Sequence, residues 1–119
     1  MANDFIRVCT PDISNSSNTT IYAVPAGASS AALESIVIGI TMANKTSSGV
    51  TASIFIDNED GSNDVFIVKD ASIPAGASLE VMSGNKLVLQ NDGSNGDNLE
   101  AICSAASSVD VTVSILQDV

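Results

Sequence analysis

Residues 109–116, Val-Asp-Val-Thr-Val-Ser-Ile-Leu, alternate strictly between apolar and polar side chains over most of their length. Side chains in a β-strand point to opposite faces in turn, so this alternation predicts a strand with one buried and one solvated face. Residues 50–57 repeat the pattern, with Val50, Ala52, Ile54 and Ile56 pointing one way. Such one-sided alternation is typical of antiparallel sheets that cover a core.

Working outward from these two segments, short β-branched runs separated by Gly, Pro, Asn and Ser clusters predict further strands. In residues 33–43 we place Ile36, Ile38, Ile40 and Met42 on one face. The predicted strands are Phe5–Cys9, Thr20–Val24, Leu33–Ala43, Val50–Asp57, Val65–Lys69, Leu79–Met82, Lys86–Gln90, Leu99–Cys103 and Val109–Leu116. The last three residues before Lys86, Ser83-Gly84-Asn85, are predicted to form a turn, and the Ala-rich stretch 28–35 one helical turn.

Eight or nine strands in 119 residues predict one all-β domain, an antiparallel β-sandwich of the jelly-roll or immunoglobulin-like type. Val24-Pro25-Ala26-Gly27-Ala28-Ser29 is echoed by Ile73-Pro74-Ala75-Gly76-Ala77-Ser78. The echo is irregularly spaced, so it indicates either repeated turn chemistry or two similar sheet halves.

Charge and composition exclude several functions. There are 14 acidic residues against four basic ones, for a net charge of −10. Nucleic acids and anionic membranes need basic patches, so we expect neither as a partner. We see no targeting segment and no apolar run long enough to span a membrane, and expect a soluble protein made in the cytoplasm.

The residues needed for catalysis are also missing. The chain has no histidine, which removes the commonest general base and metal ligand, and no nucleophile or phosphate-loop motif. We therefore expect no enzyme, no catalytic residues and no cofactor. Tyr22 is the only aromatic candidate for stacking on a sugar, and a half-buried strand position is the stronger interpretation.

The acidic loop 57–64 is a weak calcium candidate, because hard cations take several oxygen ligands. The candidate ligands are Asp57, Glu59, Asp60 and Asp64. The EF-hand spacing fails, since Gly61 falls one position early and Val68 stands where the last glutamate belongs. A solvated loop is the alternative here, and the same two alternatives apply to loop 91–98.

Cys9 and Cys103 lie in separate strand-like runs without a metal-binding spacing. Each is expected to be a buried free thiol. A disulfide between them stays open if the first strand and a late strand are neighbours.

Four segments carry a resemblance to a known group of proteins. They are residues 20–27 (TIYAVPAG), 37–48 (VIGITMANKTSS), 67–79 (IVKDASIPAGASL) and 107–116 (SSVDVTVSIL). Over about 100 residues the chain resembles small β-sandwich virion structural proteins of tailed phages, especially phages of marine bacteria. The resemblance rests on strand and turn motifs alone.

This resemblance implies a virion location, after assembly in the host cytoplasm, and most specifically a capsid decoration or cement protein that stabilises the head. The implied partners are the major capsid protein or other virion proteins, with the chain a homo-oligomer on the particle. Residues 1–19 would form an N-terminal strand and arm, and 20–119 the sandwich. The alternatives are a tail, neck or fibre-attachment component, or a module that binds the host surface.

Overall fold

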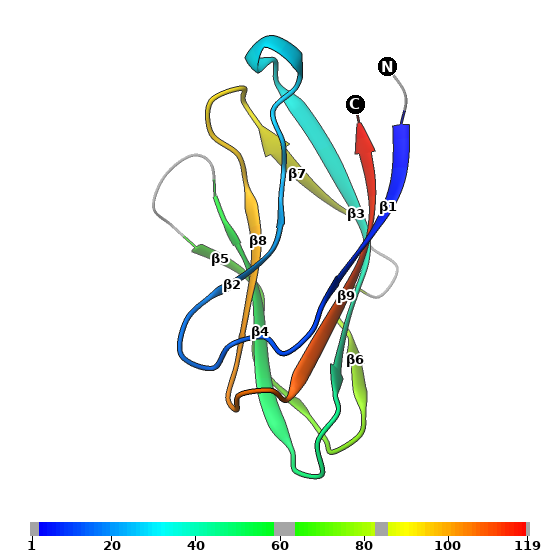
Figure 1. The fold of residues 1–119 in the computed structure, drawn as a ribbon, viewed down its shortest axis with the longest axis vertical. Coiled ribbons are helices and arrows are strands. Elements are labelled where there is room, and N and C mark those ends of the chain that lie inside the picture. Colours follow the sequence, from blue (N-terminus) through cyan, green and yellow to red (C-terminus); the bar gives the residue numbers. More distant parts are fainter. Residues whose placement is uncertain (1–2, 59–63, 83–85, 119) are drawn as a thin grey trace.

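The computed structural model describes residues 3–58, 64–82 and 86–118, which form two facing antiparallel sheets with overall dimensions of 47 × 28 × 21 Å (Figure 1). The strands are β1 (Asn3–Thr10), β2 (Thr19–Ala23), β3 (Leu33–Asn44), β4 (Val50–Asp57), β5 (Asp64–Ile73), β6 (Ser78–Glu80), β7 (Leu87–Asn91), β8 (Asn98–Cys103) and β9 (Val109–Asp118). In the stretch predicted to form a helical turn, the structure has only a short 3-10 element, η1 (Ala28–Ser30), in which Ser29 and Ser30 have positive φ values of 58° and 59°. The all-β sandwich is therefore confirmed.

The strand order decides between the two sandwich types. Sheet I has the order β1-β9-β3-β6, with β7 also paired to β3, and sheet II has the order β2-β8-β4-β5. The pairings are nested: β1 with β9, β2 with β8, β3 with β6 and β7, and β4 with β5. The chain is thus one long hairpin rolled into two sheets, which is a jelly roll. An immunoglobulin-like sandwich would instead pair several consecutive strands within one sheet.

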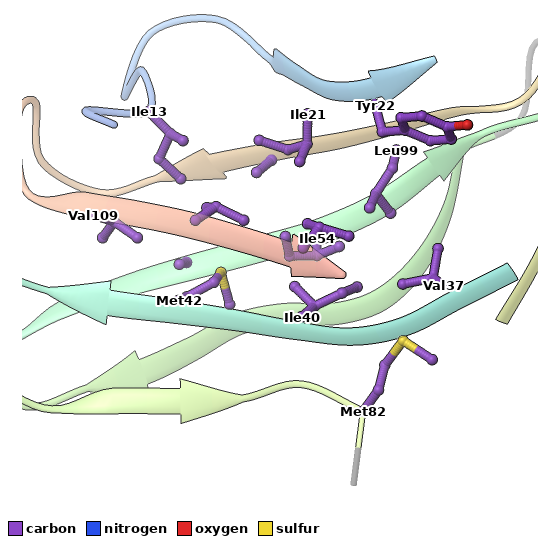
Figure 2. Close-up of a cluster of buried hydrophobic side chains, with 14 of the residues drawn as sticks. Ile13, Ile21, Tyr22, Val37, Ile40, Met42, Ile54, Met82, Leu99 and Val109 are labelled. Carbon is purple, nitrogen blue, oxygen red and sulfur yellow. The ribbon is translucent and has the colours of Figure 1, made fainter. Parts of the chain in front are cut away.

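The interior between the sheets is filled by aliphatic side chains (Figure 2). Sheet I contributes all four inward residues of β9, which are at most 1% exposed, so the alternation predicted there is confirmed. Sheet II contributes Ile54 from β4 and Leu99 from β8, both fully buried. Ile13 closes one end of the core from the loop after β1, also at 0% exposure. Burying these β-branched and leucine side chains supplies most of the driving force for the fold.

The predicted face of β3 is correct for only half of its length. Ile40 and Met42 are buried as expected, but Ile36 is half-buried and Ile38 is 39% exposed. The register of β3 against β9 shifts between Val37 and Gly39. A β-bulge adds one residue to the strand, so the inward positions change from odd to even numbers. The sequence prediction assumed strict alternation across the whole strand, and it therefore placed Ile36 and Ile38 on the wrong face.

Two other predictions concern strand ends. The prediction ended the strand at Lys69, but β5 continues to Ile73 through a further shift in register. There Asp70 has a φ of 51°, and its backbone N–H donates to Ser53 Oγ over 2.8 Å. β6 and β7 pair in turn with different parts of β3, as one interrupted edge strand. The turn predicted between them, at 83–85, lies outside the described residues.

The two similar Pro-Ala-Gly segments occupy equivalent places. Each follows an edge strand of sheet II, β2 or β5, and leads into sheet I. In the second, Ala77 N–H donates to Pro74 O over 3.0 Å and Gly76 has a φ of 68°. This positive φ is a conformation that glycine adopts without strain.

The first strand of the predicted N-terminal arm is β1, which pairs with β9 over its whole length. Residues 3–10 therefore belong to sheet I of their own chain. The division of the chain at residue 19, and the behaviour of the first segment on a particle, stay predictions.

Candidate interaction surface

An apolar row crosses the outer face of sheet I. Phe5 lies opposite Leu116, Leu116 opposite Ile36, and Ile36 opposite Val88, so four neighbouring strands contribute one residue each. Phe5 is 79% exposed and Val88 53% exposed, while Leu116 and Ile36 are half-buried between them. We call these four residues the outer apolar row. Opposite residues of paired strands lie within about 5 Å of each other, so the row is continuous.

The bulge in β3 enlarges this surface, because it turns Ile38 outward beside the row. Next along the strands come Arg7, Ser114 and Gly39, which are opposite one another in register. A Cβ built on Gly39 would meet nothing within 4 Å, so the surface is open there. Contiguous exposed apolar side chains bordered by polar ones are typical of sites that bind other proteins.

The charges around the row are mixed, although the chain as a whole is strongly acidic. Arg7 on β1 and Lys86 beside β7 are exposed and lie near opposite edges of sheet I, and Glu34 lies on β3. In the described part of the chain, neither Arg7 nor Lys86 forms an ion pair. The outer face of sheet I thus combines apolar side chains with two of the four basic residues of the chain.

Two aromatic residues pack against each other on the outer face of sheet II, where Phe66 stays 44% exposed. Phe66 on β5 packs against Phe55 on β4 with ring centroids 5.2 Å apart, and Phe55 is only 2% exposed. Lys69 Nζ lies 5.1 Å from the centre of the Phe66 ring, within cation–π distance. Glu100 lies opposite Phe55 in the register of β4 and β8. Burial, then the charge of Asp57, raises the pKa of Glu100 above its ordinary value.

The four calcium candidates are only partly within the described residues. Asp57 and Asp64 are opposite each other at the ends of β4 and β5. Glu59 and Asp60 lie outside the described residues. Among the residues that the structure describes, no three acidic or cysteine side chains gather in a way that would hold a metal ion. A calcium site in this loop therefore stays an untested prediction.

In loop 91–98 the polar side chains hold the backbone. Asp92 accepts hydrogen bonds from the N–H groups of Asn95 and Ser94, each over 2.8 Å, and these lower the pKa of its carboxyl group. Asp97 is buried and accepts from the backbone N–H of Gln90 over 2.9 Å. Both carboxylates therefore accept hydrogen bonds from backbone N–H groups in or next to the loop.

The same loop is fixed to the rest of the fold by Asn91 and Gly93. Asn91 Nδ2 donates to Val24 O over 2.8 Å, and Asn91 Oδ1 accepts from the N–H of Gly93. Gly93 has a φ of 101°, and a Cβ at this position would collide with the carbonyl oxygen of Ser30. Loop 91–98 therefore packs against η1 at Gly93, while Asp92, Ser94 and Asn95 are exposed to solvent, as a solvated loop predicts.

The connections at the other end of the sandwich form a polar cluster. Lys45 forms ion pairs with Asp12 and with Asp110, the second over 2.9 Å. The N–H of Asp12, and then Lys45, lower the pKa of Asp110, while Asp12 and then Asp110 raise the pKa of Lys45. All three side chains are well exposed, so this cluster stabilises the fold only modestly.

Tyr22 is 8% exposed, and its hydroxyl lies 2.8 Å from Ser35 Oγ and accepts from Gln117 Nε2. It offers no exposed ring for a sugar, as the half-buried interpretation predicted. Both cysteines are free, so no disulfide joins them. Cys103 is buried as expected, but Cys9 is exposed, because its position on β1 faces outward with Phe5 and Arg7.

No family model and no curated protein matches the chain. A search of solved structures matches a chain of "Structure of infectious bursal disease virus Gx strain" with 13% identity and a TM-score of 0.48. That match covers 97% of this chain and 32% of the viral one, so this protein spans about a third of that neighbour's length. No helix in the described part of the chain is long and apolar enough to span a membrane.

Proposed function

We propose that this protein is a virion structural subunit, most specifically a capsid decoration or cement protein of a tailed phage, and that it is not an enzyme. The observation that carries the proposal is the outer apolar row on a jelly-roll sandwich. Viral capsid domains are among the proteins that use this architecture. Because a fold alone does not give a function, the sequence resemblance to phage virion proteins supplies the second support.

In this proposal the chain acts by binding. The outer face of sheet I docks on a repeated site formed by neighbouring major capsid subunits. The capsid surface then covers the outer apolar row, and the docked protein bridges the subunits. The acidic remainder of the molecule faces solvent, and the net charge of −10 favours the solubility of the free protein. Shell stabilisation then comes from the free energy of docking at many sites.

A pair of matched variants tests the docking face. Val88→Asp places a charge in the outer apolar row of sheet I, whereas Val65→Asp places one at a comparably exposed position of sheet II, 48% against 53%. Purified proteins are added to capsids that lack the subunit, and bound protein is measured after sedimentation of the capsids. We expect V65D to bind like the wild type and V88D to lose most binding.

Two results would contradict this function. Absence of wild-type binding to capsids would end the cement proposal, and loss of binding in V65D alone would transfer docking to sheet II. Electron microscopy of whole particles separates the alternatives. Density over the head lattice supports decoration, density at a neck, tail or fibre supports that location, and binding to host cells alone supports a host-surface module.

A further inference from the structure

The outer edge of β1 is a strand edge with neither a bulge nor a break. β1 has eight residues and pairs with β9 without any shift in register. The other edges are interrupted: β2 is short and bulged, β5 has two register shifts, and the opposite edge of sheet I is divided into β6 and β7. Bulges and short strands are devices that keep sheet edges from pairing with other chains. β1 lacks both.

The backbone groups on this edge have no partner among the described residues. The hydrogen bonds of residues 3–10 are those of the β1–β9 ladder, and no side chain of the described chain bonds to them. β1 is the terminal strand of sheet I, and Figure 1 shows its first half at the margin of the sandwich, while its end leads toward β2. An open edge of this length is a template for the addition of another strand.

The side chains on the edge are also unpartnered. Phe5 is the most exposed large apolar residue described, at 79%. On the edge of sheet II, by contrast, Phe66 contacts both Phe55 and Lys69. Phe5 has no such aromatic or cationic neighbour in the described structure, and Arg7, on the same face, has no anionic one. The edge thus carries an aromatic ring and a cation two residues apart. In a second copy of the chain, each of these side chains has the partner that the other lacks.

We propose that two copies of this chain pair through β1, antiparallel, in the register that places Ile6 opposite Ile6 of the partner subunit. In this register Phe5 lies opposite the partner's Arg7, and the two-fold axis repeats the pair. Each dimer then gains two cation–π contacts between directly opposed side chains. The interface is isologous, as expected for a soluble dimer.

Neighbouring registers are less complementary. A register centred on Arg7 sets two guanidinium groups opposite each other. A register centred on Phe5 sets the two Phe5 rings opposite each other, so that neither Arg7 lies opposite an aromatic ring. A register centred between two residues sets an outward side chain opposite an inward one, which a continuous sheet does not allow. The Ile6 register also joins the two outer faces, so that the outer apolar rows of both copies lie on one extended sheet.

Complementary variants at exposed positions test the register. Phe5→Arg sets two arginines opposite each other twice per dimer, whereas Phe5→Arg with Arg7→Phe restores the aromatic–cation pairs in exchanged positions. Sedimentation velocity over micromolar to millimolar protein measures the dimer Kd. We expect F5R to raise Kd at least about tenfold, since two cross-strand pairs become repulsive. The double variant should recover most of the wild-type affinity.

Cross-linking gives an independent measurement. The proposed register sets residue 3 opposite the partner's Cys9, which is exposed. Asn3→Cys should therefore form a covalent dimer under mild oxidation. Asp4→Cys is the matched control, because position 4 is on the other face and out of register, and it should cross-link poorly.

A monomeric wild type at all concentrations, an F5R variant as dimeric as the wild type, or a double variant as weak as F5R would overturn the proposal. Equal Cys9–Cys9 cross-linking in all variants would also overturn it, since that requires another register. These results do not depend on capsids, so failure of the dimer and failure of the proposed function are distinguishable.

Discussion

Replacement of Asn44 by alanine should be among the most damaging single changes to this fold. Asn44 ends β3 and is 2% exposed. Its Nδ2 donates to Ser48 O over 2.8 Å, to Ile73 O over 3.0 Å and to Pro74 O over 3.2 Å. Its Oδ1 accepts from the N–H and the hydroxyl of Thr46 over 3.0 and 2.7 Å. One amide therefore joins the β3–β4 and β5–β6 connections to the sheet.

The magnitude follows from what each lost bond leaves behind. The amide has two hydrogens and two lone pairs, so the five contacts amount to at most four full hydrogen bonds. Ser48 and Thr46 lie near solvent, and water replaces part of their loss. Ile73 is 1% exposed, and an unsatisfied buried carbonyl costs about 1–3 kcal/mol. With about 1 kcal/mol for each further bond, N44A should lower the free energy of unfolding by about 3 kcal/mol.

Urea unfolding followed by circular dichroism measures this change. With an m-value of about 2 kcal/mol/M, the midpoint should fall by about 1.5 M while m stays constant. Asn15→Ala is the control, because Asn15 is exposed and makes no hydrogen bond in the described structure. N44D should be worse than N44A at neutral pH and approach it in acid, since a carboxylate facing three carbonyl oxygens has a raised pKa. A loss in N44A no larger than that in N15A would refute the reasoning.

Three further predictions concern the core and the charges. Leu99→Ala removes a fully buried side chain and should cost about 2–5 kcal/mol in urea unfolding, against little for the half-buried Ile102→Ala. The raised pKa of Glu100 means that its ionised form destabilises the fold, so stability falls as the pH rises above the ordinary value of 4.5. E100Q should remove this fall; an unchanged pH profile would contradict the burial of the carboxylate. The lowered pKa of Asp110 stabilises the fold above its ordinary value of 3.8 and is lost as the pH falls further, so thermal melts of D110N should show lower stability at pH 7 and a flatter acid limb.

Much of this architecture was predictable from the sequence because most strands obey a single alternation. In β9 every second residue from Val109 to Ile115 is buried, as the pattern predicts. The nested order of the strands was not predictable, since pairing between β1 and β9 joins residues that are about 100 positions apart and no local signal records it. The jelly-roll and immunoglobulin-like alternatives share their local patterns and differ in these distant pairings.

The candidate surface escaped sequence reasoning for a related reason. The outer apolar row exists only when β1, β9, β3 and β7 are set side by side, and each strand contributes a single apolar residue to it. Along the chain, Ile36 and Val88 look like core residues. Gly39 was the one available signal, because an isolated glycine within a strand indicates a bulge.

The bulge at Gly39 connects the stability of the fold to its surface. Before it, Leu33, Ser35 and Val37 face the core; after it, Ile40 and Met42 do. The same extra residue leaves Ile38 outside, beside the outer apolar row, where its exposed side chain adds nothing to the core. In a strand without the bulge, the apolar side chains of one of the two halves would point away from the core. Exposed apolar area on this face is therefore a direct consequence of how β3 spans the sandwich, and binding of a partner would cover it.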